Sequence, residues 1–261
     1  MRALKIAATG MEAQATRVEV ISNNIANMST TAYQTRRAEF ADLHYQQVET
    51  PGSLTSTAGT VLAAGVQLGL GVRTSAVSMN VSQGSLEQTG AELDFAIQGK
   101  GYFEVSLPSG DTAFTRDGSF KRTADGVIVT VDGYEISGGI TIPEDTKRVE
   151  ANAEGELFAY FEGEVQPQSI GQLTLATFTN VKGLEAIGSN LFLETPASGA
   201  PVSGSPGIDG AGLLNQGYLE SSSVDVVNEI TDLIEAQRGY EMNSKVVTAA
   251  DQMLAATTQI R

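Results

Sequence analysis

The sequence predicts an α+β protein whose N- and C-terminal helices form a coiled-coil-like core, with a mostly antiparallel β domain between them. Three observations lead to this prediction. The seven prolines all lie between Pro51 and Pro206, and only Gly10 and Gly239 of the 28 glycines fall outside residues 41–219, so both ends lack helix breakers. Apolar residues recur every seventh position near each end. In the middle, Asp-Gly dipeptides separate short apolar runs, as is typical of β-hairpins.

The first predicted element is a helix within residues 1–35. Four apolar side chains follow one another at intervals of seven residues, namely Leu4, Met11, Val18 and Ile25. Ala7 and Ile21 support the same face, with Gln14 between them. A repeat of seven keeps an apolar seam in register along a supercoil, so we expect this helix to pack along a second one.

The last predicted element is a helix within residues 220–261. Large side chains recur at the same interval, at Val226, Leu233, Tyr240, Val247 and Leu254, and Ala236 and Ala250 line companion positions. The two helices can pack side by side; the alternative interpretation is two ordinary amphipathic helices that cover a globular core. Burying five large side chains contributes about 8–15 kcal/mol. Ordering the backbone costs roughly 1–2 kcal/mol per residue. We therefore expect these helices to need neighbours on several sides.

Between the first helix and the β domain, residues 36–84 are predicted to form an extended Gly/Thr-rich linker with an insert. Long segments of this kind in compact proteins are usually functional or disordered. The stretch GVQLGLGVR at 65–73 has β character, and we expect it to order against a neighbour.

The β domain is predicted over residues 85–219. LDFAIQGKGYFEVSL at 93–107 contains apolar runs around a Gly-Lys-Gly turn. Asp-Gly pairs at 117–118, 125–126 and 132–133 predict hairpin turns, because glycine tolerates positive φ. GELFAYFEGEVQP at 155–167 and QLTLATFTN at 172–180 add further strands.

Composition and charge exclude several classes of function. The net charge is −15, residues 41–219 hold −13 of it, and no basic cluster occurs, so no nucleic acid is expected as a partner. Cysteine is absent, which excludes disulfides and thiolate zinc sites. No window approaches 18 apolar residues, so no membrane insertion is expected. The opening MRALKIAATGMEAQ lacks the apolar core of a cleaved secretory signal.

No pattern of side chains indicates catalysis, a cofactor or a metal. The single histidine, His44, has no partner ligands around it, and no motif frames a serine as a nucleophile. The Gly-Lys-Gly at 99–101 and the Gly-Leu-Gly at 69–71 lack the remaining residues of a phosphate-binding loop. The span 117–126 lacks the ligand spacing of an EF-hand, and acidic pairs such as 144–145 are interpreted as solvated surface. We expect no enzyme, no cofactor and no metal.

Four stretches are, taken together in this order, highly specific. They are AATGMEAQATRVEVISNNIANMSTTAY (7–33), ELDFAIQGKGYFEV (92–105), FTRDGSFKRTADG (114–126) and QGYLESSSVDVVNEITDLIEAQRGYEMNSKVVTAADQML (216–254). With them the chain resembles the flagellar basal-body rod and hook family over essentially its whole length, and most closely the distal rod member. It departs from the family pattern at Ala32, where the motif usually has Gly and where Ala disfavours a left-handed backbone, and at Lys5, where an aromatic is common.

The resemblance implies a structural subunit of the bacterial flagellar distal rod, a rigid hollow helical tube that transmits torque from motor to hook and lets exported subunits pass. The implied partners are further copies of the chain, the proximal rod and hook proteins, the surrounding ring proteins that act as a bushing, and the flagellar type III export apparatus. The implied location is the flagellar basal body across the periplasm, reached without a cleaved signal peptide. The nearest alternative is a hook or proximal rod subunit of the same axial family. A secreted β-rich binding module with helical arms is an alternative from another class.

The resemblance also implies two sets of site residues. The predicted assembly interface consists of Leu4, Met11, Val18, Ile25, Asn23, Asn24, Asn27, Tyr33, Val226, Leu233, Gln237, Arg238, Tyr240, Asn243, Val247 and Leu254. The insert GTVLAAGVQLGLGVRTSAV at 59–77 is expected to stiffen the tube, and its predicted residues are Gly65, Leu68, Gly69, Leu70, Gly71, Val72 and Arg73.

Polar residues near the helix ends suggest a sharper hypothesis. The stretch SNNIANMSTTAY at 22–33 holds three asparagines within five positions. Satisfied amide hydrogen bonds fix the register between helices where aliphatic side chains alone would slide. We therefore predict that the three asparagines, together with Gln237, Arg238 and Asn243, set register in contacts between subunits. The alternative is solvent exposure with local capping.

Overall fold

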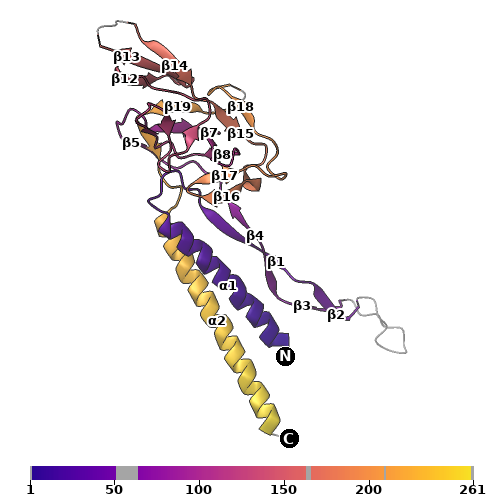
Figure 1. Ribbon diagram of the computed structural model, residues 1–261. Coiled ribbons are helices and arrows are strands. Elements are labelled where there is room, and N and C mark those ends of the chain that lie inside the picture. The colour runs from indigo at the N-terminus through magenta and orange to yellow at the C-terminus, as the bar shows by residue number, and fades with distance from the viewer. Residues whose placement is uncertain (1, 51–63, 163–165, 209, 260–261) are drawn as a thin grey trace. The chain divides into compact units, whose positions relative to one another are not determined.

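The computed structural model describes residues 2–50, 64–162, 166–208 and 210–259. The predicted α+β class is confirmed, because a helix lies near each end and strands lie between them (Figure 1). The chain divides into two compact units. Unit 1 consists of residues 1–26, 36–79 and 225–261, and unit 2 consists of residues 27–35 and 80–224.

Unit 1 contains two long helices, α1 (Arg2–Ala26) and α2 (Val226–Gln259), which lie side by side (Figure 1). They are antiparallel, since Gly10 faces Asn243 whereas Arg17, further along α1, meets Asp232. Asp225 caps the start of α2, because its Oδ1 accepts hydrogen bonds from the N–H groups of residues 227 and 228 at 3.1 and 3.3 Å. Neither helix has a stretch apolar and long enough to cross a bilayer, within the residues described.

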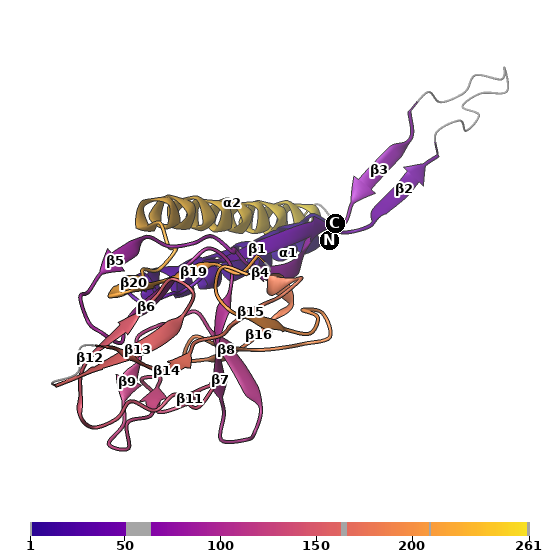
Figure 2. The same ribbon diagram turned by 90° about the horizontal axis from the view of Figure 1, so that it is seen from above.

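The strands of unit 1 occupy much of the predicted linker. They are β1 (Arg36–Asp42), β2 (Tyr45–Glu49), β3 (Val66–Gly69) and β4 (Val72–Met79). β1 pairs with β4, and β2 pairs with β3 to form a two-stranded ribbon (Figure 2). The β character predicted for residues 65–73 is confirmed, and these strands order against partners in the same chain. Residues 59–63 of the predicted insert lie outside the described residues.

Unit 2 contains the strands that follow residue 85. Its strands are β5 (Leu86–Gln88), β6 (Phe95–Gln98), β7 (Tyr102–Ser106), β8 (Thr112–Thr115), β9 (Lys121–Arg122), β10 (Ile128–Val129), β11 (Glu135–Ile136), β12 (Thr146–Ala151), β13 (Glu156–Phe161), β14 (Gln168–Gln172), β15 (Leu175–Thr177), β16 (Glu185–Gly188), β17 (Leu191–Leu193), β18 (Val202–Gly204), β19 (Leu213–Gln216) and β20 (Tyr218–Glu220), with a 3₁₀ turn η1 (Val181–Gly183). The largest sheet runs in the order β16-β17-β8-β7-β11-β10-β9, with β15 joining β7 to β18. Smaller sheets are β12-β13-β14, β6-β19 and β5-β20. All strand pairs among the described residues are antiparallel, as the sequence predicts.

Two of the three predicted Asp-Gly hairpin turns are confirmed. Gly126 and Gly133 have φ of +83° and +87°, and they join β9 to β10 and β10 to β11. The prediction for Gly118 is wrong, because β8 and β9 on either side of it do not pair and its φ is not left-handed. Glycine is needed there for another reason: a Cβ at 118 would lie well inside 3.0 Å of the backbone oxygen of Phe95.

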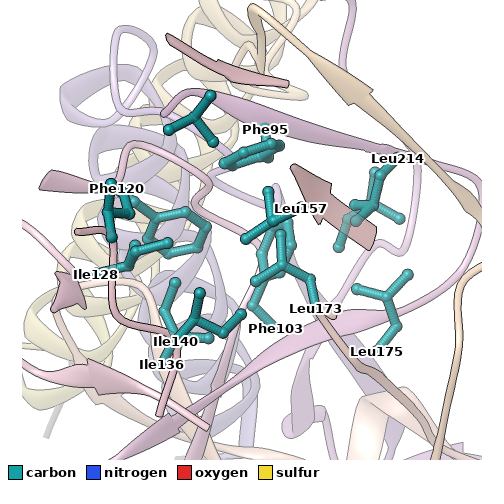
Figure 3. Packing of buried hydrophobic residues seen from close by; sticks show 13 residues of the cluster. Phe95, Phe103, Phe120, Ile128, Ile136, Ile140, Leu157, Leu173, Leu175 and Leu214 are labelled. Atoms are coloured by element: carbon teal, nitrogen blue, oxygen red, sulfur yellow. The ribbon is translucent and has the colours of Figure 1, made fainter. Parts of the chain in front are cut away.

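The core of unit 2 is built from aromatic and aliphatic side chains on several strands (Figure 3). Phe103 packs edge to face with Phe120 at a centroid distance of 5.0 Å, and Phe95 lies 6.2 Å from the same ring. Leu157 and Leu173 close the cluster and are fully buried. Burial of one such side chain contributes about 1.5–3 kcal/mol, so this cluster is a major source of stability for unit 2.

Candidate assembly interface

Small side chains line the contact between α1 and α2. The buried residues are Ala7, Ala13, Ile21 and Asn24 on α1 and Ala236 and Ala250 on α2. The predicted seven-residue seam lies beside this contact, since Leu4, Met11, Val18, Ile25, Val226, Leu233 and Val247 are half-buried and Tyr240 and Leu254 are exposed. The helices of one chain therefore meet through the companion positions, where small side chains allow their backbones to approach closely, and the larger seam residues remain partly uncovered.

A reciprocal contact explains the only two glycines in the terminal segments. A Cβ on Gly10 would lie 2.9 Å from Nδ2 of Asn243, and a Cβ on Gly239 would lie 3.1 Å from Cδ of Gln14. Each helix therefore receives an amide side chain of the other at its glycine. Glycine inside a helix costs about 1 kcal/mol relative to alanine. Close helix approach offsets that cost here.

Asn24 and Arg17 add polar contacts within the helix pair. Asn24 Nδ2 donates to the backbone oxygen of Arg36 at 2.8 Å and to Oε1 of Glu229 at 3.1 Å, while its Oδ1 accepts from the Arg36 N–H at 3.0 Å. Arg17 pairs with Asp232 at 2.9 Å and Glu235 at 3.1 Å. Burial raises the pKa of Glu229 above its usual value, although the hydrogen bond from Asn24 partly opposes this shift.

These contacts bear on the predicted register residues. Asn24 and Asn243 both contact the opposite helix of their own chain. Asn23, Gln237 and Arg238 are exposed on the helices. Their role between subunits, like that of the whole predicted interface, stays a prediction.

The predicted insert is anchored on α1. Thr9 Oγ1 accepts a hydrogen bond from the Val72 N–H at 3.3 Å, and its own O–H donates to the Ile6 backbone oxygen at 2.8 Å. Gly71 has φ of +120°, and a Cβ there would overlap Thr9 Oγ1. Of the insert residues, Leu68, Leu70 and Arg73 are exposed and Gly65, Gly69, Gly71 and Val72 are half-buried.

Exposed apolar side chains concentrate in unit 1. On its strands and the segments beside them they are Phe40, Tyr45, Val48, Val66, Leu68, Leu70 and Val77, and on its helices Ile6, Val227, Ile230, Ile234, Tyr240, Met242, Val246, Met253 and Leu254. The buried apolar residues described in this unit are mostly alanines, with Ile21 and Met79 the larger exceptions. Many large apolar side chains left exposed in one unit are typical of an interaction site.

The small polar residues after α1 build a junction inside unit 2, which we call the neck and define as residues 27–35, 80–85 and 220–224. Asn27 is half-buried, and its Oδ1 accepts from Thr30 Oγ1 at 3.1 Å. The backbone oxygen of Tyr33, also half-buried, accepts from the Ser223 N–H at 3.0 Å. Thr35 Oγ1 lies 2.7 Å from Ser223 Oγ. The polar run at 27–35 therefore pairs with the serine run at 221–223.

The expectation that alanine at position 32 disfavours a left-handed backbone is not met. The φ of Ala32 is +55°, so the left-handed backbone is retained although the residue is not glycine. The residue is buried, and its N–H donates to the Glu220 backbone oxygen at 2.8 Å. That hydrogen bond and the burial of the methyl group offset the strain of about 1–2 kcal/mol expected for an L residue in this conformation.

A buried ion pair joins the neck to the β domain. Arg116 Nε lies 2.6 Å from Glu220 Oε2, and the two side chains are 5% and 2% exposed. Arg116 also donates to the backbone oxygens of Gly99 and Gly101 at 2.7 and 3.2 Å. Sequence reasoning missed this pair, because 104 residues separate its members. It also missed Thr9, and it named Asn243 and Gln14 without relating them to the two helical glycines, although glycines inside otherwise unbroken helices are a detectable signal.

Comparison with known proteins gives a consistent result along the chain. Residues 4–34 match "Flagella basal body rod protein", residues 96–159 match "Flagellar hook protein FlgE/F/G D1 domain", and residues 215–260 match "Flagellar basal body rod FlgEFG protein C-terminal". The chain is 53% identical over 261 residues to a flagellar basal-body rod protein FlgG of Caulobacter vibrioides, with 100% of both chains covered. It is 50% identical to the FlgG of Agrobacterium fabrum and 37% identical to that of Bacillus subtilis, with 97% of each chain covered in both comparisons. The chain therefore belongs to the FlgG family of flagellar basal-body rod proteins.

Proposed function

We propose that copies of this chain polymerise into the distal rod of the flagellar basal body, a rigid hollow tube that transmits torque from motor to hook and lets exported subunits pass. The chain has no catalytic role in this proposal, and it spans the periplasm after export without a cleaved signal. Family membership supports the structural role. The observation that carries the proposal furthest is the concentration of exposed apolar side chains in unit 1.

The two units differ in how much of their apolar surface is buried within the chain. Unit 2 encloses large side chains such as Phe95, Phe103 and Leu157, none of which has exposed surface. Unit 1 buries mainly alanines and leaves residues such as Ile230 and Met242 at 47% and 63% exposure. Each large apolar side chain covered by a neighbour contributes up to about 1.5–3 kcal/mol. Further copies of the chain would therefore stabilise unit 1 by covering it, while unit 2 stays folded throughout.

The same proposal assigns the remaining partners. Proximal rod and hook proteins continue the tube at its two ends, ring proteins surround it, and the export apparatus delivers the chains. The insert at 59–77 favours the distal rod over a hook or proximal rod subunit, because it resembles the insert that distinguishes the distal member; Leu68 and Leu70 within it are exposed and available for contacts. Deleting residues 59–77 should give a rod that bends more easily in electron micrographs. An equally stiff rod would favour the alternative.

Limited proteolysis with circular dichroism of the dilute full-length chain tests the proposal. We expect proteases to trim the two helices back to about residues 26 and 225 and to leave unit 2, including the neck, because the helices gain much of their burial from neighbours. Polymerisation should then protect both ends and raise the helical signal. Ends that are already ordered and resistant in the dilute chain would contradict the proposal and favour the monomeric binding module.

A further inference from the structure

The neck contains every point at which the chain leaves or enters unit 2. The chain passes between the units four times, and the unit 2 ends of these passages are Asn27, Thr35, Asn80 and Val224. Hydrogen bonds join two of these ends, Thr35 and Asn80, to each other and to Ser223 beside the fourth. The Asn80 N–H donates to the Thr35 backbone oxygen at 2.8 Å, and the Thr35 N–H donates to Ser223 Oγ at 3.0 Å.

One residue, Glu220, connects all three segments of the neck to the β domain. Its backbone oxygen accepts from the Ala32 N–H in the first segment. Its Oε1 accepts from the Gly84 N–H in the second segment at 2.9 Å. Its Oε2 meets Arg116, which in turn holds the turn between β6 and β7 through the backbone oxygens of Gly99 and Gly101.

The second segment is held to that turn as well. Gln83 Nε2 donates to the Ile97 backbone oxygen at 2.8 Å, and Gln83 Oε1 accepts from the Gly99 N–H at 3.1 Å. A Cβ at Gly84 would overlap the backbone oxygen of Ser221, so the second and third segments are packed backbone against backbone.

A buried ion pair is weak evidence for added stability, because desolvation of the two charges offsets their attraction and apolar residues often replace such a pair without loss. Charge-assisted hydrogen bonds are, however, short and directional. Here they fix four backbone groups relative to one carboxylate, one in the neck, on residue 84, and three in the β domain, on residues 97, 99 and 101. Apolar side chains of the same volume would fill the space but would not orient these backbone groups.

We propose that Arg116 and Glu220 are positioning residues that fix the neck to the β core, so that torque crosses between the two units without the neck opening. This inference rests on the proposed function for its mechanical part. Its structural part, that the pair orders the neck rather than the whole domain, can be tested on the unpolymerised chain.

Hydrogen exchange with mass spectrometry on the full-length monomeric chain is the first test. Glu220→Gln leaves the shape of the side chain but removes its charge, so Arg116 remains buried without a counter-charge. We expect peptides covering 27–35, 80–85 and 218–224 to exchange about tenfold faster, while peptides covering 156–161 and 170–177 keep the wild-type rate. Equal acceleration of all peptides, or no change in the neck, would overturn the proposal.

An exposed pair in the same domain provides the matched control. Arg148 and Glu150 are 2.7 Å apart, but their side chains are 65% and 36% exposed. Glu150→Gln removes the same charge, and we expect no change at the neck. If Glu220→Gln does not fold, Arg116→Met with Glu220→Met removes both buried charges together. Faster exchange confined to the neck in that double variant supports the proposal, and wild-type exchange there overturns it.

The mechanical part is tested in motile cells. In a viscous medium, cells with Glu220→Gln should shed hooks and filaments severalfold more often than cells with Glu150→Gln. The two strains should carry equal numbers of rods when they are grown in dilute medium. Equal shedding would overturn the role in torque transfer. Failure of the proposed function can be told apart from failure of this inference. If the proposed function is wrong, neither wild-type nor control chains will be found in rods. The exchange experiment tests the inference without any rod.

Discussion

Two glycines of the insert offer a comparison in which the same substitution should have opposite effects. Gly71 has φ of +120°, a conformation that costs about 1–3 kcal/mol for a residue with a side chain. Its added methyl group would also overlap Thr9 Oγ1, and overpacking of this kind costs typically 1–3 kcal/mol. Gly71→Ala should therefore destabilise the anchored insert by about 2–6 kcal/mol per subunit, the sum of these two ranges. At Gly69 a Cβ would lie 3.4 Å from the Tyr45 ring, which is ordinary contact, and the φ is not left-handed. Gly69→Ala should stabilise by about 0.4–1 kcal/mol, because it restricts the unfolded chain.

The assay is dissociation of purified basal bodies in urea, followed by sedimentation of the intact rods. Gly71→Ala should lower the urea midpoint clearly, and Gly69→Ala should leave it unchanged or raise it slightly. Adding Thr9→Ala to Gly71→Ala should recover part of the loss, because it removes the overlapping oxygen but not the backbone strain. Equal midpoints for the two single variants would refute the close packing of Gly71 against Thr9.

Three further outcomes follow from the same kind of argument. Gly10→Ala should not deliver the gain of about 1 kcal/mol usual for this change in a helix, because the methyl would lie 2.9 Å from the Asn243 amide; rods that carry it should withstand no more urea than wild-type rods. Burial raises the pKa of Glu229, so the paired helices hold that proton more tightly than the unfolded chain does. Helix pairing should strengthen as pH falls from neutral through the raised pKa, and Glu229→Gln should flatten this dependence in a titration of the helical signal. Gly118→Ala should cost about 3 kcal/mol or more because its Cβ would overlap the Phe95 backbone oxygen; near-ultraviolet circular dichroism should show a melting point lower by roughly 6–12 °C, whereas Gly204→Ala, with nothing within 4 Å, should melt as the wild type does.

Local patterns in the sequence predicted the elements well. The absence of breakers at both ends predicted the helices, and the Asp-Gly pairs at 125–126 and 132–133 predicted two hairpins. Both features act within a few residues, since a helix needs only an unbroken run and a tight turn needs only glycine at positive φ. The hairpin prediction for the Asp-Gly pair at 117–118 was wrong. Glycine is required at 118 because a Cβ there would overlap the backbone of Phe95, which lies 23 positions earlier.

The contact between α1 and α2 shows what the seven-residue periodicity of the sequence does not predict. A spacing of seven predicts that one stripe of each helix is apolar, but neighbouring stripes share the spacing. The sequence predicts one face made of the larger stripe, with Leu4 and Leu233, and a companion stripe, with Ala7 and Ala236; the structure buries the companion stripe more deeply within the chain. Close approach between backbones decides this, and it depends on Gly10 and Gly239 facing amide side chains that lie more than 200 residues away.

The sequence by itself determined the α+β class, the helical ends, the β middle and, through four specific stretches, the family. Those properties depend on local propensity and on motifs read along the chain. Only the tertiary structure decided which helix face is buried, that Thr9 anchors the insert, and that Arg116 of the β domain pairs with Glu220 of the neck. The physical reason is that these contacts join residues far apart in the sequence, and their directions are set by backbone geometry that no single segment contains.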